Sequence, residues 1–441
     1  GLGQQMKRLG QFFLICSAVV LLGSCAGLTS LTGGKVTLVY SGNLDGELEP
    51  CGCSEGGNKG GILRRATKLD ELRSSKPGLV LISTGGLLIS DLPQDSIKSE
   101  FILSGLATLN YDAMGVQWRD LAFGVPLLEN SGIPFVASNW DEGEFETSQR
   151  IARSGVEMVY FQWLDPKSDP LRKMSAVKSP VVNRPEELKR ALQSENERGR
   201  VTILGTTLTL KEVQKTFDLQ HIDILLIKSK YEQIGEPRQI GKTLVLQPGS
   251  RGMRLGELDL MVSAQGEITK WEHAVHALPP TVQDSERLRP WYDDYNAKLK
   301  EDYAKRVELK KQLQTGESPY AGSDSCQSCH AKEYAKWYDT RHAEAFYALQ
   351  DVNKAFDPNC IGCHTVGFEK TGGFIDPAIT PKLLHVQCES CHGGAADHVS
   401  NRGATPVQNK DWNPQQMCAQ CHIQKHSPDF VFEKYWPLIR H

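Results

Sequence analysis

Cys326-Gln-Ser-Cys329-His330 opens the last quarter of this 441-residue chain, and its pattern recurs three times. The repeats are Cys360-Ile-Gly-Cys363-His364, Cys388-Glu-Ser-Cys391-His392 and Cys418-Ala-Gln-Cys421-His422. Cys-x-x-Cys-His is the attachment sequence of c-type haem, in which two thiols bond to the porphyrin and the histidine binds the iron from the proximal side. The sequence therefore predicts four covalently attached haem c groups.

Zinc is the alternative, because four Cys-x-x-Cys pairs would also suit two zinc ribbons. Histidine makes up only 12 of the 441 residues, so a histidine directly after each of four pairs is not expected by chance. Successive pairs are also farther apart than the roughly 15–20 residues that are usual in zinc ribbons. Both observations favour haem.

Histidine is concentrated in the same part of the chain, since nine of the 12 histidines lie after residue 320. Four of the nine are the predicted proximal ligands. A lone histidine is more often a surface or core residue than a ligand, but five more beside four irons are candidates for the second, distal axial position. These five are His342, His385, His398, His426 and His441.

The first 25 residues have the pattern of an export signal. Met6-Lys7-Arg8 is basic, and residues 12–22 are apolar but too few for a membrane span. Leu22-Gly23-Ser24-Cys25 then resembles a lipoprotein signal, so we expect Cys25 to become the lipidated N-terminus of the mature chain. An ordinary signal peptide is the alternative. Both predict export to the periplasm or cell surface, and the lipid would anchor the protein to a membrane, with the outer membrane favoured.

Cys51 and Cys53 are the cysteines that neither the haem motifs nor residues 1–25 include. A disulfide between residues so close in sequence would be strained, so metal binding, free thiols and a structural loop all stay open. The length of the chain indicates two or three domains. The net charge of −3, without a basic stripe, argues against nucleic acid as a partner.

Residues 36–281 show strand and helix patterns in alternation. Runs of β-branched and apolar residues predict strands, and residues 62–72, 98–109 and 185–192 predict helices between them. This alternation indicates an α/β domain with a parallel or mixed sheet whose faces are covered. The predicted strands are residues 36–40, 79–83, 134–137, 158–163, 201–204, 222–227, 243–246 and 258–262.

Five short motifs follow one another in this domain. They are Ser41-Gly-Asn-Leu-Asp-Gly46, Gly60-Gly61-Ile-Leu-Arg64-Arg65, Asn110-Tyr-Asp-Ala-Met114, Ile133-Pro-Phe-Val-Ala-Ser-Asn139 and Gln247-Pro-Gly-Ser-Arg-Gly-Met-Arg-Leu-Gly-Glu-Leu-Asp-Leu260. In this order they resemble the N-terminal domain of 5′-nucleotidases and related metallophosphoesterases. The resemblance implies an α/β metallophosphoesterase-like sandwich.

The departures from that family fall on its metal ligands. Asn43 and Asp45 stand where the family has an aspartate and a histidine, and Thr84-Gly85-Gly86 lacks the bridging aspartate. Arg119 takes the place of the catalytic histidine, and residues 222–242 contain no histidine. Those enzymes need two metal ions to activate water, and a cation in their place would repel them. We therefore expect a non-catalytic domain that serves docking or spacing.

Residues 282–317 predict a charged connection between two domains. The stretch from Asp284 to Gln312 has no glycine and only one proline, Pro290. Val307, Leu309 and Leu313 form a sparse apolar stripe, so we expect a long solvated helix that acts as a spacer, with a partner-binding helix as the alternative.

Residues 318–441 are a short stretch for four haems, so we expect porphyrins to fill much of the interior and short helices to surround them. The blocks around the motifs include Tyr320-Ala-Gly-Ser-Asp-Ser before Cys326, Thr340-Arg-His342-Ala, Gly372-Gly-Phe374, Val386-Gln before Cys388, Ser427-Pro-Asp-Phe430 and Trp436-Pro-Leu-Ile-Arg-His441. These blocks resemble the cytochrome c-554 family of tetrahaem electron carriers. The resemblance implies a mostly α, loop-rich multihaem cytochrome c domain.

The same resemblance implies that His342, His398 and His441 are distal ligands, with His385 and His426 as further candidates. Families of this type can leave one iron five-coordinate, and we expect that iron at His364. The predicted function is electron transfer between redox protein partners. The alternative is an oxidoreductase that acts on a small nitrogen or sulfur compound at one open haem. An active phosphoesterase is a third candidate, which the missing ligands disfavour.

Overall fold

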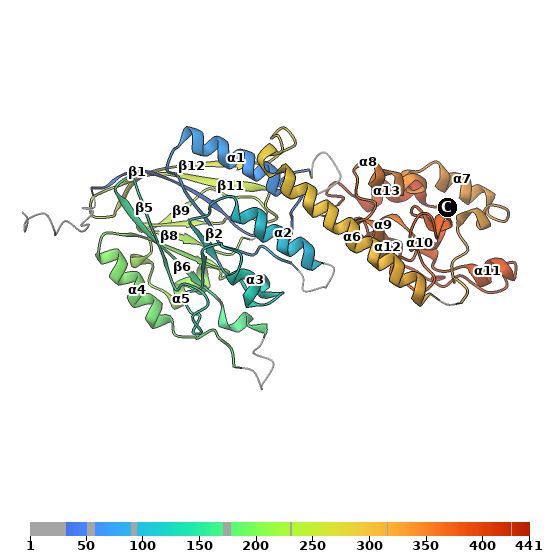
Figure 1. The fold of residues 1–441 in the computed structure, drawn as a ribbon, viewed down its shortest axis with the longest axis horizontal. Coiled ribbons are helices and arrows are strands. Elements are labelled where there is room, and N and C mark those ends of the chain that lie inside the picture. The colour runs from blue at the N-terminus through green and yellow to red at the C-terminus, as the bar shows by residue number, and fades with distance from the viewer. Residues whose placement is uncertain are drawn as a thin grey trace, which may run out of the picture.

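The computed structural model describes residues 32–50, 58–89, 95–170, 178–229, 232–314, 316–424 and 426–441. Cys25, Cys51 and Cys53 lie outside these ranges, so the predictions for them have no structural counterpart here. Figure 1 shows a strand-rich N-terminal part and a C-terminal part of short helices, joined by the long helix α6. Within the ranges given, no helix combines the length and the apolar character that a membrane crossing requires.

Two mixed six-stranded sheets build the described N-terminal part, in the orders β12-β11-β1-β2-β3-β4 and β5-β6-β7-β8-β10-β9. In the first sheet β1, β2, β3 and β4 are parallel to one another, and β11 and β12 extend it by antiparallel pairing. In the second sheet β6, β7, β8 and β10 are parallel, and the antiparallel strands β5 and β9 form the two edges. The first sheet comprises β1 Gly34–Ser41, β2 Val80–Ser83, β3 Ala113–Gly115, β4 Phe135–Val136, β11 Arg254–Val262 and β12 Ile268–Ala277. The second comprises β5 Gln149–Arg153, β6 Val156–Trp163, β7 Val201–Thr206, β8 Ile224–Leu226, β9 Arg238–Ile240 and β10 Thr243–Leu246.

The two sheets pack face to face with helices on their outer faces. Alternate residues of a strand point to opposite sides, so Val36, Leu38 and Tyr40 of β1 enter the core between the sheets. Val39, between them in sequence, enters the core under the helices instead. The helices of this part are α1 Ile62–Ser75, α2 Ser96–Ala107, α3 Val125–Glu129, α4 Pro185–Glu197 and α5 Leu210–Thr216.

The eight predicted strands all form, and the predicted sandwich is confirmed. Four strands were missed, namely β3, β5, β9 and β12. Strand β3 has only three residues, which is too short for a periodic pattern. Strand β12 lies at a sheet edge with mostly exposed or half-exposed side chains, so its charged residues hide the strand pattern.

The close packing of the sheets yields a first prediction. Leu38→Ala removes a fully buried side chain between the sheets, so the free energy of unfolding should fall by about 2–5 kcal/mol. Leu309→Ala is the control, because Leu309 is 55% exposed, and it should change that value by less than about 0.5 kcal/mol. Chemical denaturation followed by circular dichroism measures both, and equal losses would contradict this packing.

Helix α6 (Arg289–Leu313) lies in the predicted charged connection, but one of its faces is buried and not solvated. Its buried face consists of Tyr295, Leu299 and Val307, which are spaced by four and eight residues along the helix. Leu309 and Leu313 are exposed. The Trp291 indole donates to the carbonyl oxygen of Phe101 on α2 at 3.1 Å. The helix is therefore packed along the N-terminal part, because its aromatic residues supply an apolar face.

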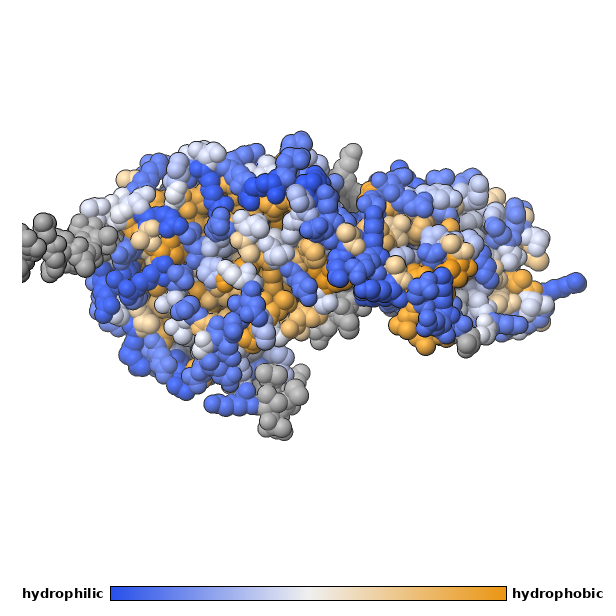
Figure 2. All heavy atoms as spheres, in the orientation of Figure 1, coloured by the Kyte–Doolittle hydropathy of each residue, from blue (hydrophilic) through white to orange (hydrophobic). Residues whose placement is uncertain are grey.

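The C-terminal part consists of short helices and loops, as predicted. Its buried apolar cluster is small, with Phe346, Ile361 and Phe374 at its centre. Large apolar side chains such as Tyr338 and Leu438 are exposed, and Figure 2 shows apolar atoms at the surface of this part. Both features fit an interior completed by porphyrin. The helices are α7 Ala331–Tyr338, α8 Ala345–Asp351, α9 Pro358–His364, α10 Cys388–His392, α11 Ala396–Ser400, α12 Pro414–Cys418 and α13 Phe432–Ile439.

Candidate haem centres

The four Cys-x-x-Cys-His motifs adopt helical turns. The second motif ends α9, the third is α10, and the fourth begins at the last residue of α12. In the first motif the His330 amide donates to the Cys326 carbonyl oxygen at 2.9 Å, which is the same turn. Residues three and four apart share one helix face, so each turn presents two thiols and one imidazole to the same porphyrin.

Thiols from different motifs lie next to one another. Cys326 and Cys388 hydrogen-bond to each other, which raises the pKa of Cys326 and lowers that of Cys388. Cys363 and Cys421 form a second such pair, and this bond lowers the pKa of Cys363 to about 7. The first motif is therefore beside the third, and the second is beside the fourth.

Cys391, in the third motif, is affected by the fourth. Burial, and after it the charge of Cys418, raises the pKa of Cys391 to about 11.

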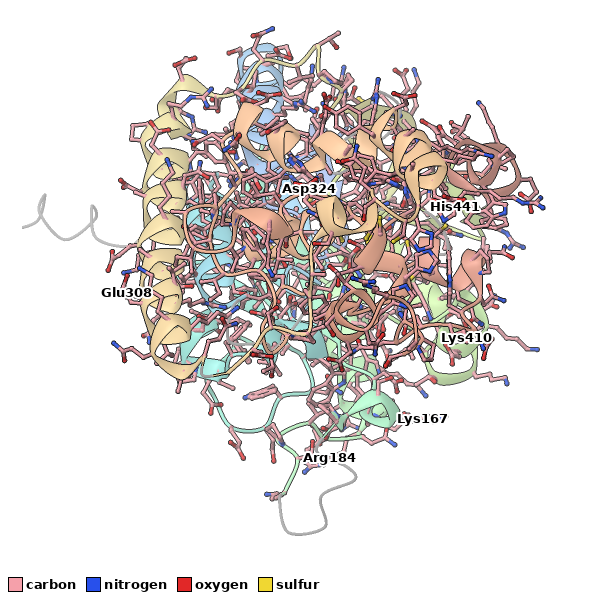
Figure 3. All side chains as sticks on the ribbon, turned by 90° about the vertical axis from the view of Figure 1, so that its right-hand side faces the viewer. Lys167, Arg184, Glu308, Asp324, Lys410 and His441 are labelled. Atoms are coloured by element: carbon pink, nitrogen blue, oxygen red, sulfur yellow. The ribbon has the colours of Figure 1, made fainter. Side chains whose placement is uncertain are left out.

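Three proximal histidines face a second histidine ring. The ring centroids are 6.2 Å apart for His330 and His398, 6.1 Å for His422 and His342, and 5.8 Å for His392 and His441. A metal–nitrogen bond to imidazole is about 2.0 Å long, and the nitrogen lies about 1.1 Å from the ring centre. Two imidazoles on opposite sides of one metal ion therefore have ring centroids about 6 Å apart. The described residues therefore fit an iron between the rings of each pair. His441, in the last of them, lies on the opposite side of the view from α6 in Figure 3.

Hydrogen bonds orient the rings for this role. The Nδ1 atoms of His398, His441 and His364 lie 2.8, 3.1 and 2.5 Å from the carbonyl oxygens of Thr405, Ile439 and Ala345. A carbonyl only accepts, so Nδ1 carries the proton and leaves Nε2 available to a metal. Burial also lowers the pKa values of His342, His392 and His422, which favours the neutral form that binds iron.

His364 differs from the other three proximal histidines. It belongs to none of the three ring pairs described above. His385 accepts the Phe346 amide proton at Nδ1, at 3.1 Å, and packs edge-on against Tyr347. His426 lies in the turn after His422, where its amide donates to Ile423. The structure thus brings His342, His398 and His441 to motif histidines, whereas His385 contacts the Phe346 amide and the ring of Tyr347.

The second site of interest follows the carboxyl ends of β1, β2 and β3, where ligands bind in open α/β sheets. Asp45 forms an ion pair with Arg119, and its other carboxylate oxygen accepts the Arg251 amide at 3.0 Å. The Gln117 side-chain amide donates to Asn43 Oδ1 at 2.8 Å. Over the part of the chain that the structure describes, no three histidine, cysteine or acidic side chains are grouped to hold a metal ion.

Asp120 holds the loop that lacks the bridging aspartate, a role that the sequence motifs did not reveal. Its fully buried carboxylate accepts the amides of Gly86, Leu87 and Gln117 at 2.9, 2.6 and 2.9 Å. Burial raises the pKa of Asp120, and these amide donors oppose that shift. The polar groups of this site therefore bond to one another.

Comparison with known sequences agrees with the motifs. The profile of the family described as cytochrome c554 and c-prime matches residues 325–393. Cytochrome c-554 of Nitrosomonas europaea is 30% identical over 138 residues, which cover 24% of this chain and 59% of the relative. A snake venom 5′-nucleotidase of Gloydius brevicauda is 25% identical over 126 residues, which cover 26% of this chain and 21% of that protein. The chain therefore spans less than two thirds of each relative.

Comparison with solved structures concerns the N-terminal part. A 5′-nucleotidase precursor of Thermus thermophilus superposes with a TM-score of 0.52 and 16% identity, over 60% of this chain and 59% of that one. A sulfate thiohydrolase of the same organism gives 0.51 and 14%, over 60% of each chain. At such identity the likeness shows the fold alone. The chain thus joins an α/β domain with the fold of 5′-nucleotidases and related phosphoesterases to a helical domain similar to cytochrome c554.

Proposed function

We propose that this protein is a tetrahaem c-type cytochrome that relays electrons between redox protein partners. The observation that carries the proposal is the set of three histidine pairs, each with ring centroids 5.8–6.2 Å apart and each containing one motif histidine. When bound, c-type haem supplies one-electron chemistry. The eight motif cysteines would hold the four haems, and the carbonyl-bonded imidazoles would orient the axial nitrogens.

The closeness of attachment points from different motifs supports a relay. Cys326 contacts Cys388, and Cys421 contacts Cys363. Haems held at neighbouring points would be close enough to exchange electrons. Relay by four centres predicts that one chain takes up four electrons reversibly in a titration followed by the visible haem bands. Uptake of fewer electrons by the purified protein would contradict the proposal.

The alternative is an oxidoreductase that uses an open iron at His364. The observation that favours it is that His364 belongs to none of the three ring pairs, while its Nδ1 is bonded to the Ala345 carbonyl oxygen. Carbon monoxide is a suitable probe for an open position on a reduced haem. Binding to one haem per chain, followed by turnover of a small nitrogen or sulfur compound, would favour this alternative over a simple relay.

We also propose that the phosphoesterase-like domain is non-catalytic and serves docking or spacing. The Arg119 guanidinium forms an ion pair with the Asp45 carboxylate, and the backbone amide of Arg251 donates to the other carboxylate oxygen. Both oxygens of Asp45 are therefore occupied, and Arg119 balances its charge. With added Mn²⁺ or Zn²⁺, the purified protein should hydrolyse p-nitrophenyl phosphate no faster than the blank. Metal-dependent turnover that Asn43→Ala with Asp45→Ala abolishes would refute this assignment.

We also propose that the protein is exported and anchored to a membrane by lipid. The pattern of residues 1–25 supports export to the periplasm or cell surface, with lipid on Cys25 and the outer membrane as the favoured anchor site. Cys25→Ala should move the protein from the membrane fraction to the soluble fraction. An unchanged distribution would contradict the lipid anchor.

A further inference from the structure

A buried lysine joins the two domains. Lys354 follows α8 in the cytochrome c554-like domain and is 8% exposed. Its Nζ lies 2.6 Å from the carboxylate of Glu49, which belongs to the phosphoesterase-like domain. It also donates to the side-chain oxygen of Asn296 on α6 at 2.9 Å. The ammonium group of Lys354 therefore bonds both to the phosphoesterase-like domain and to α6.

Aromatic rings enclose the same ammonium group. Nζ lies 5.6, 5.2 and 5.9 Å from the ring centroids of Tyr292, Tyr295 and Phe356, all within reach of a cation–π interaction. Tyr292 and Tyr295 belong to α6, and Tyr292 also donates its hydroxyl proton to Glu49. These rings and the Glu49 carboxylate hold the cation in a fixed place, where water screens its charge less than at a surface.

This cage is connected directly to one haem attachment site. The Asp357 amide donates to the Lys354 carbonyl oxygen at 3.0 Å, and the Cys360 amide donates to the Asp357 carbonyl oxygen at 3.0 Å. Asp357 is itself buried, and its carboxylate accepts the Asn359 amide as the N-cap of α9. The turn that begins at Lys354 therefore sets the start of the helix that carries Cys360, Cys363 and His364.

Packing across the interface supports the same connection. Phe356 belongs to the buried cluster that contains Tyr295 and Leu299, although it lies in the other domain. Tyr303, one helical turn farther along α6, donates its hydroxyl proton to the Ile375 carbonyl oxygen at 3.1 Å. Its ring packs against the same cluster as Cys360. The segment from Lys354 to Cys360 is thus held between α6 and its own domain.

We infer that Lys354 is a positioning residue through which the phosphoesterase-like domain holds the second haem motif and raises the reduction potential of the haem there. Reduction adds negative charge, so a nearby buried cation stabilises the reduced form, while Glu49 acts in the opposite direction. The inference rests on the proposed function, because it requires haem at Cys360 and Cys363. It gives the phosphoesterase-like domain a role that does not depend on hydrolysis.

Potentiometric titration of the full-length haem protein tests the inference, with visible and EPR spectra recorded at each potential. Lys354→Met keeps the length of the side chain but removes the charge, so it should lower one of the four potentials. Glu49→Gln should raise the same potential. The double variant should lie close to the wild type, because two opposite charges are removed together.

The controls use an exposed ion pair on α6, the helix that also carries Tyr292 and Tyr295. Glu301 and Lys305 of α6 are 52% and 69% exposed at their side chains. Glu301→Gln and Lys305→Met should leave all four potentials where they are, since water and salt screen exposed charges. Lys354→Arg keeps the charge and should retain the potential. If Lys354→Met fails to fold, the comparison of Glu49→Gln with Lys354→Arg replaces it as the test.

The outcomes separate this inference from the function on which it rests. Fewer than four haems, or no reversible titration in the wild type, would refute the proposed relay. Four reversible potentials that neither Lys354→Met nor Glu49→Gln changes would refute the inference alone. Equal shifts of all four potentials would also refute it, because a cage beside one motif must act mainly on one haem.

Discussion

Oxidised protein at low temperature should show three low-spin haems and one high-spin haem per chain by EPR. The three low-spin centres correspond to the pairs of His330 with His398, His422 with His342, and His392 with His441. Two imidazoles give a strong axial field, whereas one imidazole gives a weak one. The high-spin centre should be the haem at His364.

His398→Ala tests the pairing directly. The variant removes the ring that lies 6.2 Å from His330, so the high-spin signal should double to two haems per chain while the haem content is unchanged. His385→Ala is the matched control, because its Nδ1 is bonded to the Phe346 amide and its ring lies opposite no proximal histidine of the described residues. This control should leave the spin count as it is.

Two results would contradict the assignment. Four low-spin haems in the wild type would mean that His364 has a strong partner, and His385 or His426 would then be the ligand to test. A high-spin signal that doubles in His385→Ala but not in His398→Ala would show that the ring pairs do not represent axial ligation.

Cys326→Ala with Cys329→Ala should remove one haem. The pyridine haemochrome assay should fall by about a quarter, because four equivalent motifs each attach one haem. The loss should also reduce stability, since the apolar cluster around Phe346 and Phe374 is small and porphyrin must supply much of the interior. The thermal midpoint of the C-terminal domain should therefore fall as well.

Ser328→Ala is the control for this variant, because it lies between the two cysteines and is exposed. It should keep the haem content and the midpoint of the wild type. A full haem content without both thiols would show that the first motif does not form thioether bonds, and would remove the main argument for a cytochrome.

Local patterns in the sequence were sufficient for most of the fold. The apolar, β-branched run of residues 36–40 predicted β1, and the structure places its alternate side chains in two different cores. Edge strand β12 was missed, because its side chains are exposed or half-exposed and several are charged. A long helix was predicted where α6 lies, but the sequence did not reveal that Tyr295 and Leu299 form a buried face.

The sequence by itself determined the chemistry of the haem sites, because Cys-x-x-Cys-His is complete within one helical turn and needs no distant residue. Only the tertiary structure decided which histidine ring lies opposite which motif histidine. His342 meets His422 and His441 meets His392 across long loops, and loop closure gives no preference that can be read from spacing. The contact of Lys354 with Glu49 is of the same kind, since it joins two domains far apart in the chain. Such contacts depend on how whole elements pack, whereas an attachment motif depends on its own five residues.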